Sequence, residues 1–345
     1  MQKIIILILG LSLTAASCNL LGGGGGSKGV LKSDDGGKSF HPAIQLAEKK
    51  TIGGVSVNIM TMDSDRPDTI YLGSSNGIFK TEDGAASWRQ ILTGIAVSDI
   101  ASDPAKPSTI YAVGLAGRNG KIIKSPDGGA TWADIYTEPS KSNAVTTISV
   151  SKANSRILLA GLTTGEIIRS TDEGVTWQVV RDLQDPLLRI RFYNSSTAYA
   201  LTLTKGLNKS TDQGSNWSPL PVSDLQLPST GSTVRRYLDM SFDQKLSGVI
   251  FLATEQGLLR TVDDGVMWSV MYLPVRDTSL KVTAVAVNPN DSNGLYIAVG
   301  STLFKSTNGG VTWETIKLPS NQTVRQITVN PSTPNVIYLG MGDNK

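Results

Sequence analysis

Hydroxyl and carboxylate groups that could do chemistry recur along this chain in one pattern, Ser/Thr-x-Asp-x-Gly-x-x-aromatic. The pattern occurs seven times and contains all six tryptophans of the chain, with Ala85 replacing the glycine once and Asn308 replacing the aspartate once. Such an aspartate could be catalytic or could bind calcium, or it could accept hydrogen bonds from the backbone of its own turn. The pattern residues are Ser33, Asp35, Gly37, Phe40; Thr81, Asp83, Trp88; Ser125, Asp127, Gly129, Trp132; Ser170, Asp172, Gly174, Trp177; Ser210, Asp212, Gly214, Trp217; Thr261, Asp263, Gly265, Trp268; and Ser306, Asn308, Gly310, Trp313.

The recurrence of the pattern favours a structural role over catalysis. The Asp and the Ser/Thr hydroxyl can satisfy backbone N–H groups of a tight turn, the Gly can adopt a left-handed conformation, and the aromatic ring can pack against the sheet. A calcium loop is disfavoured because the alternating oxygen ligands and the final Glu are missing. We therefore predict seven structural hairpin turns, slightly weaker in the copies that carry Ala85 and Asn308.

The spacing of the copies sets the architecture. Successive aromatic residues are 40 to 51 residues apart, which is typical of one four-stranded propeller blade per repeat. The repeat around residues 281–317 has four short apolar stretches separated by turn residues, and these predict an antiparallel meander. The basic residue directly before each copy is expected on the solvated outer face of the blade.

The two ends of the chain are incomplete in complementary ways. The N-terminal part begins with a third and a fourth strand around residues 29–42, whereas the C-terminal part stops after a first and a second strand around residues 324–340. Joined together, they complete one blade. We predict an all-β fold, a seven-bladed β-propeller of four-stranded antiparallel blades, closed by pairing of the N- and C-terminal strands.

The repeated pattern resembles the Asp-box, or BNR repeat, of the propellers in sialidases, xyloglucanases, sortilin-type receptors and the photosystem II stability/assembly factors. In those families the box lies at the blade periphery, away from the binding face. The resemblance to the assembly factors, which include lipid-anchored single propellers, implies a protein-binding scaffold. It implies neither chlorophyll-protein partners nor any particular arginine patch.

Catalysis of the sialidase or xyloglucanase type finds little support in the residues. The segment Arg189-Ile-Arg191-Phe is the nearest string to the sialidase Phe/Tyr-Arg-Ile-Pro segment, but it lacks the proline and lies in the middle of the chain. Glycoside hydrolysis needs two opposed carboxylates, and Asp99 and Asp239 are the candidates near the predicted channel. His41 is the single histidine, which disfavours both a Ser-His-Asp triad and a metal site built from histidines.

The N-terminal segment predicts export and a lipid anchor. Residues 1–17 read as a signal peptide, with a basic start, a short apolar run and small residues before Cys18, the only cysteine. This arrangement resembles the lipobox of bacterial lipoproteins, which implies lipidation of Cys18, a tether over 18–28 and a propeller over 29–345. An ordinary secretory signal with an incidental cysteine is the alternative.

The irregular loops are the expected binding surface. The long connection 218–236 contains Leu220, Leu225 and Leu227, which we expect to be exposed, together with Arg235 and Arg236. Further candidates are Arg118, Arg189, Arg191 and Arg276. The alternative is that the connection is a disordered insertion.

Together these features predict a lipoprotein of the cell envelope without catalytic activity, cofactor or metal. A protein partner is favoured, and a glycan-binding protein or glycoside hydrolase is the alternative. Nucleic acid is disfavoured because the net charge is only +3 and no basic run occurs.

Overall fold

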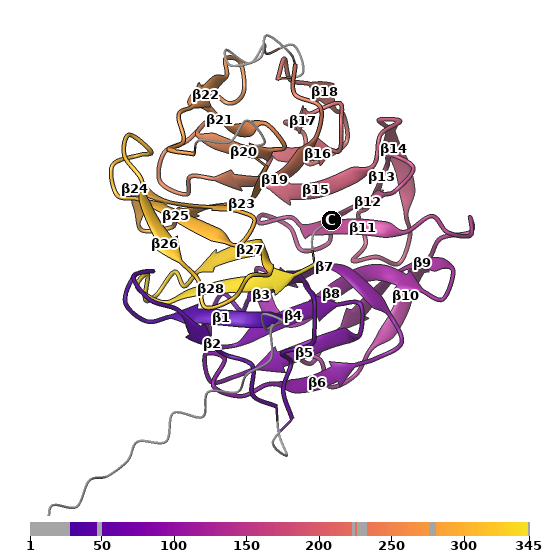
Figure 1. The fold of residues 1–345 in the computed structure, drawn as a ribbon. Helices are drawn as coiled ribbons and strands as arrows, with labels where there is room; N and C mark the ends of the chain where they lie inside the picture. Colours follow the sequence, from indigo (N-terminus) through magenta and orange to yellow (C-terminus); the bar gives the residue numbers. More distant parts are fainter. Residues whose placement is uncertain (1–27, 47–49, 223–224, 226–232, 276–280, 344–345) are drawn as a thin grey trace, which may run out of the picture.

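The computed structural model describes residues 28–46, 50–222, 225, 233–275 and 281–343. Their strands form seven four-stranded antiparallel sheets, which follow one another around a ring (Figure 1). This arrangement confirms the predicted seven-bladed propeller. Blade 1 contains β3–β6, blades 2 to 6 follow in chain order, and blade 7 contains β27, β28, β1 and β2.

The four strands of a blade run outward from the central channel. The innermost strands are β3 (Val57–Met62), β7 (Ala96–Asp103), β11 (Val145–Val150), β15 (Leu187–Phe192), β19 (Tyr237–Phe242), β23 (Val282–Asn288) and β27 (Thr323–Val329). The second strands are β4 (Ile70–Ser74), β8 (Lys106–Ala116), β12 (Leu158–Leu162), β16 (Ala198–Thr202), β20 (Ile250–Thr254), β24 (Asp291–Val299) and β28 (Ile337–Gly342). The third strands are β5 (Gly77–Thr81), β9 (Asn119–Ser125), β13 (Glu166–Ser170), β17 (Leu207–Ser210), β21 (Gly257–Thr261), β25 (Thr302–Ser306) and β1 (Gly29–Ser33). The outer strands are β6 (Arg89–Leu92), β10 (Ala133–Thr137), β14 (Gln178–Asp182), β18 (Ser218–Pro219), β22 (Ser269–Met271), β26 (Glu314–Lys317) and β2 (His41–Pro42).

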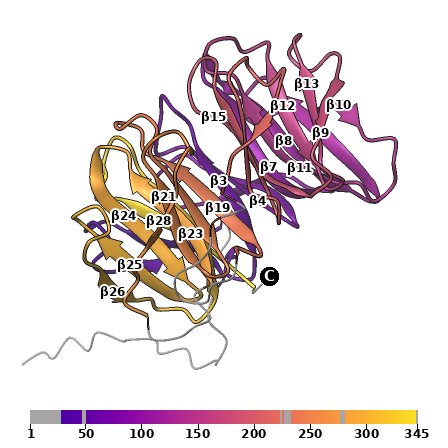
Figure 2. The same ribbon diagram turned by 90° about the horizontal axis from the view of Figure 1, so that it is seen from above.

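Burial falls from the inside of each blade to the outside. Every residue of β4, β12, β16, β20 and β28 is buried, because neighbouring blades cover both faces of each second strand. The outer strands are mostly exposed, as in β14. Figure 2 shows the blades from the side, with the sheets of neighbouring blades facing one another. The hydrophobic core is therefore a set of seven layers between blades.

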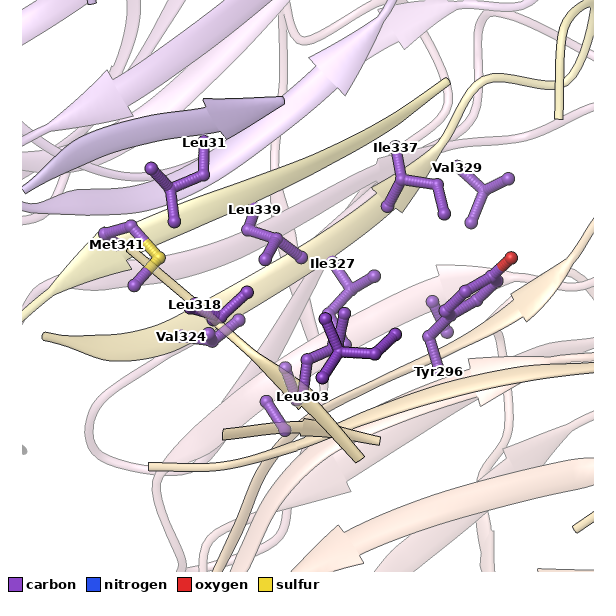
Figure 3. Packing of buried hydrophobic residues seen from close by; sticks show 14 residues of the cluster. Leu31, Tyr296, Leu303, Leu318, Val324, Ile327, Val329, Ile337, Leu339 and Met341 are labelled. Carbon is purple, nitrogen blue, oxygen red and sulfur yellow. The ribbon is translucent and has the colours of Figure 1, made fainter. Parts of the chain in front are cut away.

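The ring closes within blade 7, as the incomplete ends predicted. Strand β1 pairs antiparallel with β28, and Leu31 lies opposite Leu339 in that register. Leu31, Leu339 and Met341 share a core cluster with residues of blade 6, including Tyr296 and Leu303 (Figure 3). The two ends of the propeller are therefore joined by backbone hydrogen bonds and by side-chain packing.

Each box forms a compact turn between a third and an outer strand. In blade 2 the Ser125 hydroxyl donates to the Asp127 carboxylate (2.8 Å) and accepts from the Gly129 N–H (2.8 Å), while Asp127 accepts from the Thr131 N–H and hydroxyl. These bonds lower the pKa of Asp127 to about 2, the hydroxyl of Thr131 contributing most. In blade 6 Asn308 reproduces the pattern, since its amide oxygen accepts from Ser306 and from the Thr312 N–H.

The basic residue before each box is not on a solvated outer face, and that expectation is wrong. Lys80 is 5% exposed and donates to the Gly128 carbonyl in the box of the next blade (3.1 Å), and Arg169 likewise donates to the Gln213 carbonyl (3.0 Å). The Lys80 ammonium also lies 5.3 Å from the centre of the Tyr71 ring. The box turn thus receives a cation from the preceding blade, so it joins blades as well as strands.

Candidate functional site

Every innermost strand contains a β-bulge at the same place. The pairing with the second strand skips one residue near the start of the inner strand, for example between Val57 and Ile59 in blade 1 and between Val282 and Ala284 in blade 6. A bulge redirects the side chain of the unpaired residue. The seven skipped residues are Asn58, Ser98, Thr146, Leu188, Leu238, Thr283 and Arg325.

All seven skipped residues line one cavity of about 880 Å³. The cavity therefore occupies the mouth of the central channel at the edge where the inner strands begin, and we call it the mouth cavity. Its apolar lining includes Leu187, Leu203 and Val299. A volume of this size accommodates a small ligand or a few residues of a peptide.

The charged lining of the mouth cavity is mostly basic. Among the described residues the lining has four cations, Arg189, Arg236, Lys281 and Arg325, and one carboxylate, Asp343. The Asp343 carboxylate forms an ion pair with Lys28 at 2.7 Å. The cavity is thus suited to an anionic or mixed polar and apolar group.

Arg325 contributes donors that the described part of the chain does not fully satisfy. Its Nη1 atom donates to the Ser56 hydroxyl at 3.1 Å, whereas its buried Nη2 atom has no hydrogen-bond partner among the described residues. Burial, together with the nearby charge of Arg189, lowers the pKa of Arg325. A buried donor without a partner is costly, and an incoming acceptor would remove that cost.

Deeper in the channel, Asp99 joins three blades. Its fully buried carboxylate accepts two hydrogen bonds from Arg191 of blade 4 (2.7 and 3.0 Å). It also accepts from the Thr147 hydroxyl (2.7 Å) and the Ile148 N–H (3.0 Å) of blade 3. Burial raises the pKa of Asp99, but the pairing with Arg191 outweighs it and holds the pKa below its usual range. Asp99 is therefore an ionised, saturated structural group.

Asp239 differs from Asp99 in its pairing. Its carboxylate lies 3.6 Å from the Arg189 Nε atom and accepts from the Val285 N–H at 3.3 Å. Burial raises the pKa of Asp239, with Arg189 opposing the shift. Neither Asp99 nor Asp239 lines the mouth cavity. The two aspartates thus do not face each other there as an acid pair.

Of the candidate binding residues, Arg189 and Arg236 line the mouth cavity. Arg191 is taken up by Asp99, while Arg235 and Arg118 are exposed on the loops outside the cavity lining. Leu227 and Arg276 lie outside the described residues.

The expectation that Leu220 and Leu225 are exposed is wrong. Both are half-buried and pack against the apolar cluster between blades 4 and 5. The described residues of the connection 218–236 contribute to the core there, because the outer strand β18 is only two residues long and leaves apolar surface to be covered.

Sequence reasoning missed Arg325 and Lys281 as cavity residues. Aligning the inner strands by their bulge would have grouped Arg325 with Asn58 and Thr283. The bulge itself has no sequence signature in these strands, so the alignment depends on the structure.

Two further findings concern the described residues alone. No cluster of three or more His, Cys, Asp or Glu side chains that could hold a metal ion occurs among them. Nor does this part of the chain contain a helix of the length and hydropathy needed to cross a membrane. The predicted signal peptide and Cys18, the predicted site of lipidation, lie outside the described residues.

No protein-family profile and no curated protein matches the chain at the level of sequence. Solved structures match it in fold. The GH74 xyloglucanase from Xanthomonas campestris is similar with a TM-score of 0.69 and 17% identity over 84% of this chain and 51% of the enzyme. The chain thus spans about half the length of that xyloglucanase.

Two structures of YCF48 match this chain over nearly their whole length. YCF48 from Cyanidioschyzon merolae has a TM-score of 0.62 and 15% identity over 84% of this chain and 97% of its own. YCF48 bound to a D1 peptide has a TM-score of 0.62 and 17% identity over 84% and 93%. This chain therefore shares the seven-bladed propeller fold with a glycoside hydrolase and with a peptide-binding protein.

Proposed function

We propose that this chain is an exported, lipid-anchored propeller that binds a protein partner at the mouth cavity without catalysis. The observation that carries the proposal is the convergence of the seven bulged residues on one cavity with four basic side chains and an apolar wall. An arrangement of this kind can hold a peptide segment by hydrogen bonds, charge and apolar contact. The likeness to YCF48 supports it, because the match covers 93% of that protein's chain and that protein is bound to a peptide.

The partner can be tested with a variant that fills the cavity. Thr146→Trp places a large side chain at a bulge position, and Ser195→Trp is the matched control on the exposed loop between β15 and β16 at the opposite edge. Affinity isolation of the lipidated protein from envelope membranes should recover a stoichiometric partner with the wild type and with Ser195→Trp, and lose it with Thr146→Trp. A partner that both variants retain equally would argue against binding in the cavity.

The lipid anchor is proposed from Cys18 and the sequence before it. Growth with a fatty acid that carries a detectable tag should label the wild type and leave Cys18→Ser unlabelled. Labelling that survives the substitution would reject Cys18 as the modified residue.

A glycan-binding protein or glycoside hydrolase is the second candidate, motivated by the fold shared with the xyloglucanase. The lining of the mouth cavity argues against hydrolysis, since its one described carboxylate is paired with Lys28 and hydrolysis ordinarily uses two. Reducing-end release from polysaccharides, together with binding to a glycan array, would decide between the two functions.

A further inference from the structure

The described chain enters the propeller at the same edge as the mouth cavity. Strand β1 begins at Gly29, which pairs with Met341 near the end of β28. The preceding residue, Lys28, donates its backbone N–H to Gly53 and pairs through its ammonium with Asp343 of the cavity lining. The connection to Cys18 therefore leaves the propeller beside the channel mouth.

That connection is short compared with the height of a blade. Nine residues separate Cys18 from Lys28, and the ten steps between these two residues span at most about 36 Å even when fully extended. A strand of six residues alone is about 20 Å long, so reaching the opposite edge would use most of this length. An anchor at Cys18 consequently favours an orientation with the mouth edge toward the lipid.

The two edges of the ring differ in charge. In an antiparallel meander the loops between blades and the loops between second and third strands share one edge, here the mouth edge. Its exposed or half-exposed carboxylates are Glu166, Asp182, Glu255 and Asp343. Its exposed or half-exposed cations include Lys28, Arg118, Lys141, Lys205, Arg235, Arg236, Lys281 and Lys317. Two of them, Arg236 and Lys281, share the Glu255 carboxylate as an ion-pair partner.

The opposite edge contains the seven box turns with their six aspartates. These aspartates are ionised at neutral pH, but the same edge also has exposed cations, such as Lys38, Lys106 and Lys245. The excess of cations is therefore on the mouth edge, and an anionic surface would attract that edge more strongly.

We propose that the mouth edge is the membrane-facing surface of the anchored protein, and that Arg235, Arg236 and Lys281 bind anionic lipid headgroups. The proposal rests on lipidation of Cys18. It also restricts the partner of the mouth cavity to segments close to the lipid surface.

The orientation can be measured with a single fluorophore on each edge. The lipidated full-length protein is placed on vesicles of phosphatidylcholine with or without phosphatidylglycerol, and the vesicles contain a quencher attached to the headgroups. Ser75→Cys places a label on the mouth edge, and Ser195→Cys places one on the box edge. Lipidation blocks the Cys18 thiol, so labelling of the protein without an added cysteine reports failure of the anchor separately from failure of the orientation.

The proposal predicts several-fold stronger quenching at Ser75→Cys than at Ser195→Cys, increased by phosphatidylglycerol. The increase should disappear in 1 M salt, where the Debye length is about 3 Å. It should also disappear in the variant Arg235→Glu/Arg236→Glu/Lys281→Glu. The control variant Lys38→Glu/Lys106→Glu/Lys245→Glu has the same change in net charge on exposed residues of the other edge and should keep the increase.

Two results would overturn the proposal. One is equal quenching at the two positions, which would mean that the anchored protein has no preferred orientation on the membrane. The other is quenching at Ser75→Cys that is insensitive to lipid charge, which would exclude binding to anionic headgroups. Folding of both charge variants is checked by their thermal unfolding, which should match that of the wild type.

Discussion

The box edge and the mouth edge are built from the same seven repeats, but only the box edge keeps the repeats alike. At the box edge a hydroxyl and an Asp or Asn make the same bonds in each blade, as Ser125 with Asp127 and Ser306 with Asn308 show. At the mouth edge the equivalent positions hold side chains as different as Ser98, Leu188 and Arg325. Repetition therefore marks the positions that maintain the scaffold, and variation marks the positions free to recognise a ligand.

The hydrogen bonds between blades along the channel also differ from one pair of blades to the next. Blades are joined there by unequal contacts, such as the Thr283 hydroxyl donating to the Val324 carbonyl (2.7 Å) and the Gln326 amide donating to the Met60 carbonyl (2.7 Å). The Asp99 cluster is the most extensive of them. The inner wall thus combines structural bonds with the side chains that line the cavity.

The largest expected effect comes from opening the ring. Deletion of residues 323–345 removes β27 and β28, and it exposes Leu31 together with the blade 6 surface that packs against them. Because the blades depend on their neighbours for buried surface, we expect loss of the cooperative thermal transition in circular dichroism. An unchanged melt would mean that closure contributes nothing to stability.

Asp99→Ala should cost about 3 kcal/mol of unfolding free energy, since it leaves the Arg191 guanidinium without its buried partner. Asp239→Ala is the matched comparison in the same channel. It should cost less than Asp99→Ala, because the Asp239 carboxylate has a longer ion pair and a raised pKa. Urea unfolding of both variants tests the difference, and equal losses would contradict the distinction between the two aspartates.

Ser125→Ala should cost about 1–3 kcal/mol, since it leaves the buried Gly129 N–H without an acceptor. Ser195→Ala is the control, because that serine is exposed. The same measurement should show no change for the control within about 0.5 kcal/mol. A large effect on ligand binding with none on stability would instead place the box in a functional site.

The box aspartates should make the fold sensitive to acid. Their pKa is lowered in the folded state, to about 2 for Asp127 and Asp172, from an ordinary value of 3.8. Their contribution to stability is therefore complete above about pH 4 and is lost as the pH falls toward 2. The urea midpoint should decline over this range, and Asp127→Asn with Asp172→Asn should flatten the decline. A decline equally steep in the double variant would assign the acid sensitivity to other carboxylates.

The smallest expected effect concerns the residue before the box glycine. Gln213 has a φ of 58°, where four of its six counterparts are glycines with φ between 64° and 74°. Gln213→Gly should raise the unfolding free energy by about 1 kcal/mol or less, because the left-handed conformation is unfavourable for a residue with a Cβ. The larger entropy that glycine loses on folding opposes this gain and keeps it small. A loss of stability would show that the side chain of Gln213 contributes packing.

The sequence alone determined the architecture of this protein, and the tertiary structure alone decided its candidate site. The box pattern needs only local hydrogen bonds, so the number of its copies predicted the number of blades. The complementary ends of the chain predicted the ring closure in which β1 pairs with β28. The mouth cavity depends on side chains such as Asn58, Thr146 and Arg325, which are far apart in the chain and meet only when the ring closes. Bulges in the backbone pairing direct their side chains into the channel. These positions hold different residue types, so the sequence does not predict a bulge there. For the same reason the sequence suggested Arg191 as a candidate binding residue, whereas in the folded ring it is the partner of Asp99.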